Sequence, residues 1–273
     1  MKIYTIKDIA QKAGVSVTTV SRVLNHRPDV NRETREKVER VMAACHFVGN
    51  ANARGLKQTE GDLVAIIIRG HQNPFLNALA ESILQQTKDC KATFLTEFID
   101  EKADEFQTAL RLLHERRVNG FIFVGSRIDQ RAHELSGLDL PMVFTTVSAQ
   151  QAGLPSAASV AIDDRAMGRL ATQVLLERGH RKIAVFAMSD TVAMGVCRAL
   201  SDIGRRVPED VSVIGFDGTE MGKYYTPRLS TIEQPIEELA SQTVLVLTDM
   251  LEHGVPPRHV TVEATLRLRE SVL

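Results

Sequence analysis

A run of short polar side chains beside one arginine is the first feature of this sequence with an evident chemical use. The stretch VSVTTVSRVLN covers residues 15–25. In a helix that begins at Ser16, apolar side chains share one face: Val17, Val20, Val23 and Leu24. Polar side chains share another: Thr18, Ser21, Arg22 and Asn25. Hydroxyl, amide and guanidinium groups hydrogen-bond to base edges and phosphates. The stretch therefore predicts a helix that packs on a core and contacts a nucleic acid.

The neighbouring residues predict the elements that would position this helix. Thr5 with Asp8 three residues later is typical of a helix start, and Gly14 suits the turn before Ser16. A third helix is expected after Asn31, with an apolar stripe that includes Val38. Three short helices with a tight turn predict a helix-turn-helix unit, whose second helix enters the DNA major groove. The alternative is an ordinary three-helix module that binds no DNA.

The charge distribution separates this segment from the rest. The first 57 residues carry 11 Lys and Arg against 5 Asp and Glu, a net +6, and the remainder has 22 against 29, a net −7. A basic module on an acidic body favours an anionic partner for the first part only. A solvated charged surface is the alternative that charge by itself leaves open.

The remaining residues predict an α/β body. Apolar runs such as LVAIII and GFIFVG alternate with helical patterns such as KADEFQTALRLLHERR. This order predicts a parallel sheet with helices on both faces, and ligands bind outside the carboxyl ends of such strands. Later in the chain, RKIAVFAMSD reads as one strand over residues 181–190.

Several function classes lack their usual signals. The sequence has no HExxH, GxSxG or GxGxxG motif, and its three cysteines are widely spaced. The first residues show no signal-peptide core, and no apolar run is long enough to cross a bilayer. We expect a cytoplasmic protein with no metal or cofactor, no membrane partner and no enzymatic activity.

The sequence resembles the lactose/galactose-repressor family of bacterial transcription regulators. The resemblance rests on TIKDIAQKAGVSVTTVSRVLN and ANARGLK in the first 57 residues. It continues in NPF, VNGFIFVGS, SDTVAMGVCRAL and VPEDVSVIGFDG. It implies a helix-turn-helix headpiece (1–48), a hinge helix and linker (49–61) and a periplasmic-binding-protein-like body (62–273). The body would have one lobe at about 62–161 and 236–257, and a second, shortened lobe at about 162–235 and 258–273.

The resemblance also implies roles for individual residues. Those that match the family's DNA contacts are Thr5, Val17, Thr18, Thr19, Ser21, Arg22, Asn25, Asn50, Ala53 and Leu56. Leu56 matches the leucine wedged into the minor groove, and an apolar wedge of that kind kinks DNA. Packing of Leu56 against the body is the alternative. Gly49 stands where the family usually has proline, and Gly55 lowers the helix propensity of the hinge.

A second set of residues matches the family's effector contacts: Phe75, Asp163, Ser189, Asp190 and Asp217. The effector would be a sugar or a related metabolite. The three aspartates have an alternative role as caps of the following helices.

One departure from the family concerns the second lobe. The family has two further helices and a strand between the strands that match RKIA and VFAMSD, and these are missing here. The resemblance implies a homodimeric repressor of carbohydrate-related genes that binds a near-palindromic operator in double-stranded DNA. The alternative is a DNA-binding protein that has lost its ligand response with the missing segment.

Overall fold

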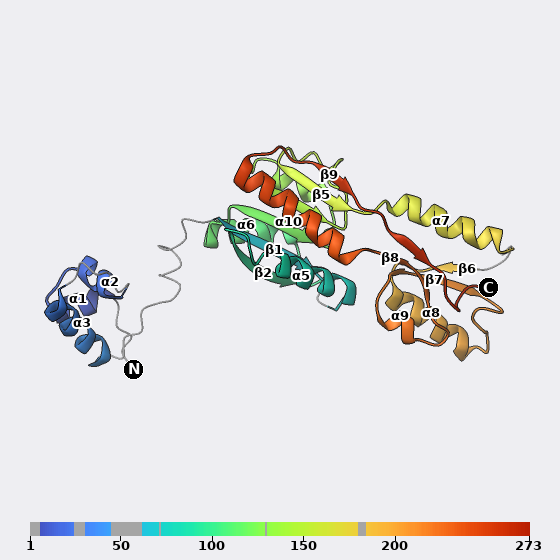
Figure 1. The fold of residues 1–273 in the computed structure, drawn as a ribbon, viewed down its shortest axis with the longest axis horizontal. Coiled ribbons are helices and arrows are strands. Elements are labelled where there is room, and N and C mark those ends of the chain that lie inside the picture. Colours follow the sequence, from blue (N-terminus) through green and yellow to red (C-terminus); the bar gives the residue numbers. More distant parts are fainter. Residues whose placement is uncertain (1–5, 25–30, 45–61, 71, 129, 180–183) are drawn as a thin grey trace. The chain divides into compact units, whose positions relative to one another are not determined.

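The computed structural model of the chain divides it into two compact units, residues 1–60 and 61–273 (Figure 1). It describes residues 6–24, 31–44, 62–70, 72–128, 130–179 and 184–273.

The first unit contains a three-helix headpiece. Its described helices are α1 (Ile6–Ala13), α2 (Val17–Leu24) and α3 (Arg32–Ala44). Gly14 makes the turn before α2 with a φ of +61°, a conformation that suits glycine. The three helices pack around a small core in which Val20, Val23 and Val38 are buried. The predicted helix-turn-helix unit is therefore confirmed.

The first lobe of the body, the part built on a six-stranded sheet, is entirely parallel. The strand order is β2-β1-β3-β4-β5-β9. The strands are β1 (Leu63–Arg69), β2 (Thr93–Ile99), β3 (Gly120–Val124), β4 (Met142–Thr145), β5 (Ala157–Ala161) and β9 (His259–Thr261). The accompanying helices are α5 (Pro74–Gln86), α6 (Glu105–Arg116), the 3-10 helix η1 (Gln130–Leu135) and α10 (Ile236–His253).

Helices cover both faces of this sheet because its central strands are apolar on both sides. Alternate residues of β1 enter two different cores. Ile66 packs with α5 and α10, whereas Ile67 packs with α6 and η1. A strand buried on both faces must be apolar throughout, which explains the run LVAIII. The predicted α/β fold class is confirmed.

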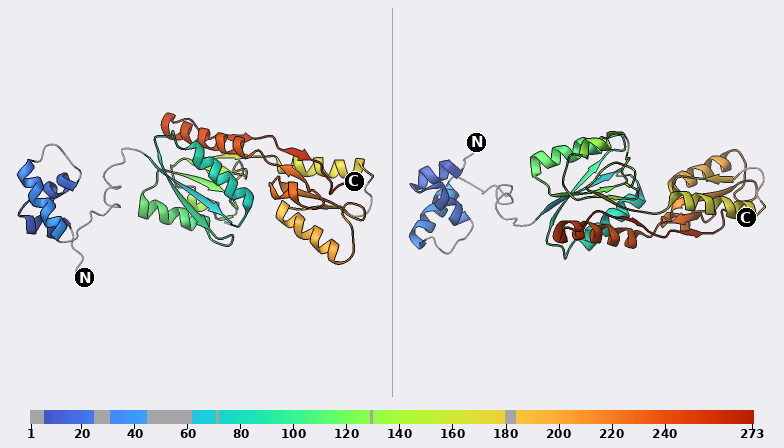
Figure 2. Two further views of the ribbon diagram at one scale, coloured as in Figure 1. Left: turned by 60° about the horizontal axis from the view of Figure 1, so that its bottom comes forward. Right: turned by 90° about the horizontal axis from the view of Figure 1, so that it is seen from above.

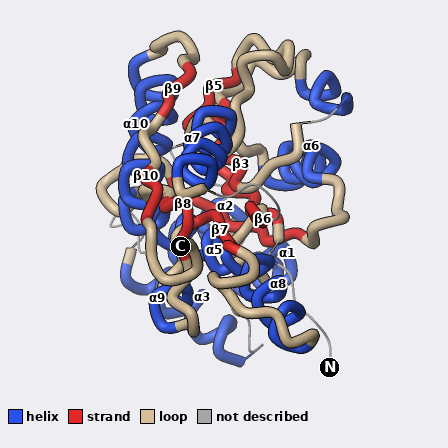
Figure 3. The backbone as a smooth tube through the Cα atoms, turned by 90° about the vertical axis from the view of Figure 1, so that its right-hand side faces the viewer, coloured by secondary structure: helices blue, strands red, loops and turns tan. Residues whose placement is uncertain are grey.

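The second lobe, the part built on a four-stranded sheet, is smaller. Its strand order is β10-β8-β7-β6, with β10 antiparallel to β8 (Figure 3). The strands are β6 (Ala184–Phe186), β7 (Ser212–Asp217), β8 (Ser230–Glu233) and β10 (Thr265–Arg267). The helices are α7 (Asp164–Glu177), α8 (Asp190–Asp202) and the short α9 (Met221–Tyr224). Figure 2 shows α7 and α8 on opposite sides of the sheet, each with its own apolar core.

Two sequence predictions about this lobe are wrong in detail. The resemblance implies that residues 258–273 belong to the second lobe, but β9 within this segment pairs with β5 in the first sheet. The chain therefore extends the first sheet by the three residues of β9 before it enters the second sheet at β10. Of the strand predicted over 181–190, Ala184–Phe186 form β6, Ser189 caps α8 and Asp190 begins it. Residues 181–183 lie outside the described residues.

Candidate nucleic-acid interface and effector residues

The turn and cap before α2 fix its orientation on the headpiece core. The Ser16 hydroxyl accepts a hydrogen bond from the backbone N–H of Thr19 at 3.0 Å, as expected of an N-cap. Val20 and Val23 are buried against the other two helices. The opposite face of α2 is therefore directed away from the headpiece core.

The exposed surface of α2 carries the predicted base-reading side chains that the structure describes, with Val17 at the edge of the apolar face and Arg22 beyond it. Val17 is 42% exposed and Arg22 is also exposed. The Thr19 hydroxyl lies 2.9 Å from the Ser16 hydroxyl, so Thr19 supports the cap. Thr18 and Ser21 belong to α2, but their side chains lie outside the described part. An exposed methyl-bearing residue suits contact with thymine methyl groups, and an exposed guanidinium suits guanine edges.

Other predicted DNA contacts cannot be placed. Thr5, Asn25, Asn50, Ala53 and Leu56 lie outside the described residues. The predicted hinge over 49–61 lies outside them too, so the wedge and packing alternatives for Leu56 both stay predictions.

Asp163 and Ser189, predicted effector contacts, both cap helices. The Asp163 carboxylate accepts a hydrogen bond from the Ala166 backbone N–H at 2.9 Å at the start of α7. The Ser189 hydroxyl accepts from the Val192 backbone N–H at 3.2 Å at the start of α8. The capping alternative is confirmed for Asp163. For α8, the cap is Ser189 and not Asp190.

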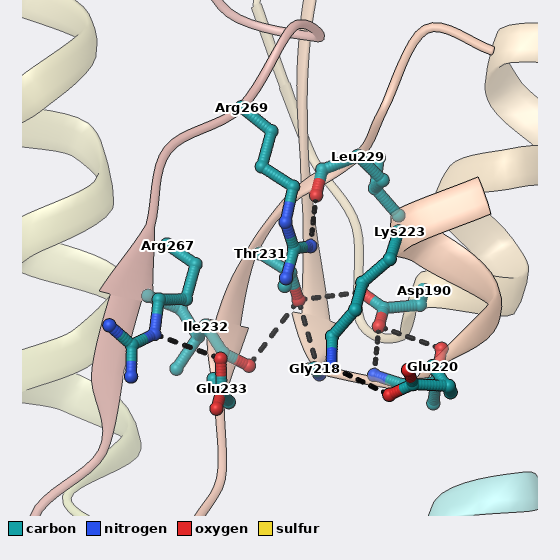
Figure 4. Close-up of polar contacts among 11 residues, drawn as sticks. Asp190, Gly218, Glu220, Lys223, Leu229, Thr231, Ile232, Glu233, Arg267 and Arg269 are labelled. Carbon is teal, nitrogen blue, oxygen red and sulfur yellow. Dashed lines mark hydrogen bonds and ion pairs between the residues drawn. The ribbon is translucent and has the colours of Figure 1, made fainter. Parts of the chain in front are cut away.

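Asp190 is fully buried and holds together three segments of the second lobe (Figure 4). Its Oδ2 accepts hydrogen bonds from the Thr219 backbone N–H at 2.6 Å and the Thr219 hydroxyl at 2.9 Å. Its Oδ1 accepts from the Thr231 hydroxyl at 2.6 Å. Gly215 must be glycine here, because a Cβ would collide with Asp190 Oδ1 and with Cδ2 of Leu229. Both carboxylate oxygens are thus engaged within the protein.

Asp217 lies at the carboxyl end of β7 and is also buried. Its Oδ1 accepts a hydrogen bond from Nε2 of Gln234 at 2.9 Å. Burial raises the pKa of Asp217 to about 7, the Gln234 hydrogen bond opposes that rise, and the nearby Asp190 charge adds to it. Asp217 does not cap a helix, since α9 begins four residues later without a side-chain cap.

Phe75, the predicted effector contact of the first lobe, is a core residue. It is 3% exposed and packs in the cluster between the sheet, α5 and α10. The structure brings Asp190 and Asp217 together, while Phe75 belongs to the other lobe.

A polar cluster in the first lobe was missed by sequence reasoning. Arg69 ends β1 and pairs with Glu105, the first residue of α6, with 3.2 Å between Nη2 and Oε2. The Ser126 hydroxyl donates to Oε1 of Glu105 at 2.6 Å. The available signal was an arginine at the end of the apolar run LVAIIIR, at the strand end where ligands bind in α/β folds.

Two kinds of site are absent from the described residues. No group of three or more His, Cys, Asp or Glu in that part of the chain could hold a metal ion. No helix found there is long and apolar enough to cross a membrane.

Comparison with family models identifies both units. Residues 5–50 match the model of bacterial regulatory proteins of the lacI family. Residues 110–272 match the periplasmic binding protein-like domain.

Curated relatives match along almost the whole chain. The transcriptional regulator MalR of Clostridium butyricum is 27% identical over 329 aligned positions, covering 97% of this chain and 98% of MalR. The ribose operon repressor of Haemophilus influenzae is 28% identical over 336 positions, covering 98% of both chains. Both alignments are longer than the 273 residues of this chain, so each relative has residues without a counterpart here.

Solved structures share the fold. The lac repressor dimer bound to operator and an anti-inducer superposes with a TM-score of 0.71 at 24% identity, covering 100% of both chains. The regulator CelR in complex with cellobiose gives 0.69 at 23% identity, covering 98% of this chain and 99% of CelR. The two family models and the curated relatives that match almost the whole chain show that the chain belongs to the lacI family of bacterial regulatory proteins and is a DNA-binding transcription regulator.

Proposed function

We propose that the chain represses carbohydrate-related genes by binding a near-palindromic operator as a homodimer. The observation that carries this proposal is the α2 surface, where Val17 and Arg22 are exposed while Val20 and Val23 are held in the core. The similarity to proteins named ribose operon repressor and transcriptional repressor PurR supports the repressing role. The protein acts in the cytoplasm and catalyses no reaction.

The base-reading residues are Val17, Thr18 and Arg22, and the residues that position the helix on the DNA backbone are Thr5, Thr19, Ser21 and Asn25. Asn50, Ala53 and Leu56 contact the minor groove from the hinge. Leu56 supplies an apolar wedge at the operator centre.

Dimer formation is supported by apolar side chains on the second lobe. Met221 and Tyr224 of α9 are 65% and 77% exposed. They are three residues apart in one helical turn, a spacing that puts two side chains on the same face, and exposed apolar side chains that lie together suit contact with another chain. Helix-turn-helix dimers bind two half-sites about one helical turn apart, which predicts a near-palindrome.

Selection of bound sites from random double-stranded DNA tests the proposal. We expect the selected sites to share one motif of two inverted half-sites, and we expect binding to weaken steeply with salt. Selection of unrelated sequences, or a motif without inverted symmetry, would contradict the proposed operator recognition.

We also propose that operator binding does not respond to sugars. Phe75, Asp190 and Asp217 are buried, and both aspartates accept hydrogen bonds from the protein itself. A ligand that controls DNA binding must interact differently with two arrangements of the protein. The shortened second lobe offers fewer groups with which to do so.

Thermal melting with a panel of sugars and nucleobases tests this second part. A ligand at 100 times its Kd would add roughly 2.7 kcal/mol to the free energy of unfolding. We expect no such rise in Tm and no change in operator affinity. A sugar that raises the Tm and shifts operator affinity tenfold would show that the effector response is intact.

A further inference from the structure

The first-lobe sheet has a well-defined position for a ligand. In the order β2-β1-β3-β4-β5-β9, the winding direction reverses between β1 and β3. Doubly wound sheets bind ligands outside the carboxyl ends of the strands at this reversal. Arg69 is the last residue of β1, and Ser126 follows β3 by two residues. This position therefore holds polar side chains of the chain itself.

The Arg69 guanidinium occupies this position among oxygen acceptors. Its Nη1 donates to the Glu101 carbonyl at 2.5 Å, and its Nη2 lies 3.2 Å from Oε2 of Glu105. The second carboxylate oxygen of Glu105 accepts from the Ser126 hydroxyl at 2.6 Å and the Arg127 backbone N–H at 3.0 Å. Arg69 is 9% exposed and Glu105 is 2% exposed. The Glu101 carbonyl and the Glu105 carboxylate thus form a buried binding site for a guanidinium group, and Arg69 occupies it.

One donor of this guanidinium is left unmatched. Among the described residues, Arg69 Nε is a buried polar atom without a hydrogen-bond partner. A buried donor without a partner is unfavourable, because it has lost its hydrogen bonds to water and gained none within the protein. The oxygen acceptors therefore pair with Nη1 and Nη2 of Arg69. Nε joins the guanidinium to the rest of the side chain, and no acceptor in the described part of the chain lies within hydrogen-bond distance of it.

The surrounding loops leave little room for a second ligand. Gly125 has a φ of +71°, and a Cβ there would stand 2.6 Å from the nearer methyl group of Leu76. Phe75, beside Leu76, is buried in the core. The segments that follow β1 and β3 thus pack closely, with the Arg69 and Glu105 side chains between β1 and α6.

We propose that Arg69 is a built-in ligand of the first lobe, and that its removal leaves a specific binding site for small guanidinium cations formed by Glu105 and the Glu101 carbonyl. This inference rests on the proposed absence of a sugar response. It explains that absence for the first lobe, because Arg69 occupies the position where a ligand would bind. In the wild-type chain the Arg69 side chain occupies this site, so a small-molecule ligand cannot bind there.

The test replaces the tethered guanidinium with a free one. Arg69→Ala leaves the Glu105 carboxylate buried without its partner, and we expect the Tm to fall by roughly 6–15 °C. Millimolar ethylguanidinium should restore part of this loss with a saturable dependence on concentration. Sodium chloride at equal ionic strength should not. If Arg69→Ala does not fold by itself, the yield of folded chain after refolding with ethylguanidinium is the readout.

Two controls decide between a specific site and general stabilisation. Arg69→Ala with Glu105→Gln removes the charged acceptor, so we expect no response to ethylguanidinium. Arg267→Ala removes an exposed ion pair, in which Nε of Arg267 lies 2.9 Å from Oε2 of Glu233. We expect only a small fall in Tm for this variant and no rise in Tm with ethylguanidinium. No rescue of Arg69→Ala, or an equal rescue of the double variant, would overturn the proposal.

The response of the wild-type chain to sugars is measured separately by thermal melting. A sugar that raises the wild-type Tm would contradict the proposed absence of a sugar response and would leave the ethylguanidinium result standing, so the two failures are distinguishable.

Discussion

At the scale of single residues, the two buried aspartates of the second lobe behave differently because their hydrogen-bond partners differ. Asp190 accepts three hydrogen bonds from two threonines, whereas Asp217 accepts one side-chain hydrogen bond, from Gln234. Burial raises the pKa of both carboxyls. We therefore expect their amide replacements to have opposite effects on stability.

Asp217→Asn should stabilise the protein at high pH. The pKa of Asp217 is about 7 in the folded chain and ordinary in the unfolded chain, so between about pH 4 and 7 the folded state binds more protons. The free energy of unfolding therefore falls as the pH rises through this window. Asn keeps Oδ1 for Gln234 and carries no charge. Urea unfolding should show the variant about 1–4 kcal/mol more stable than wild type at pH 8, and nearly equal to it at pH 4.

Asp190→Asn is the matched control, and it should destabilise the protein at both pH values. The new amide would direct a donor at one of the threonine donors, which costs about 1–3 kcal/mol. Parallel pH profiles for Asp217→Asn and wild type would contradict the assignment of the charge penalty to Asp217.

At the scale of elements, α2 should determine operator preference through Arg22. Arg22→Ala should lose roughly 1–3 kcal/mol at the selected operator and lose preference at one base pair per half-site. Arg40→Ala, which removes an exposed arginine from α3, should weaken all DNA sequences about equally. Operator and random-DNA titrations check both. If Arg22→Ala still discriminates fully between operator and random DNA, Arg22 does not read bases.

The second-lobe sheet should open more readily than the first. β6 has three residues and one strand neighbour, while β1 has seven residues and two neighbours. Local opening is easiest where few apolar contacts and hydrogen bonds hold an element. Hydrogen exchange followed by mass spectrometry should show β6 amides exchanging well before those of β1. Equal protection of the two strands would mean that the lobes unfold as one cooperative unit.

At the scale of the whole molecule, the body should contribute to operator affinity by joining two headpieces. The headpiece segment is basic and the body is acidic, so direct attraction of the body to DNA is not expected. A linked pair of headpieces gains about 10²–10⁴ in affinity over a single one. A fragment of residues 1–60 should therefore bind operator at least about a hundredfold more weakly than the full chain. Equal affinities would mean that the body supplies no dimer contacts.

The sequence by itself determined the features that depend on local pattern. The helix cap at Ser16, the turn at Gly14 and the apolar strand LVAIII each follow from a few neighbouring residues. The headpiece, the parallel α/β body and the family could be predicted because periodicity, capping and motif spacing agree with one another.

Only the tertiary structure decided which polar residues the protein uses for itself. Asp190 and Thr231 lie far apart in the sequence, and Arg69 meets Glu105 only because α6 returns to the end of β1. No local pattern shows whether a carboxylate faces solvent or a buried threonine. Burial and hydrogen-bond partners arise when distant segments pack, and they place Phe75, Asp190 and Asp217, whose effector contacts stay predictions, in the protein interior.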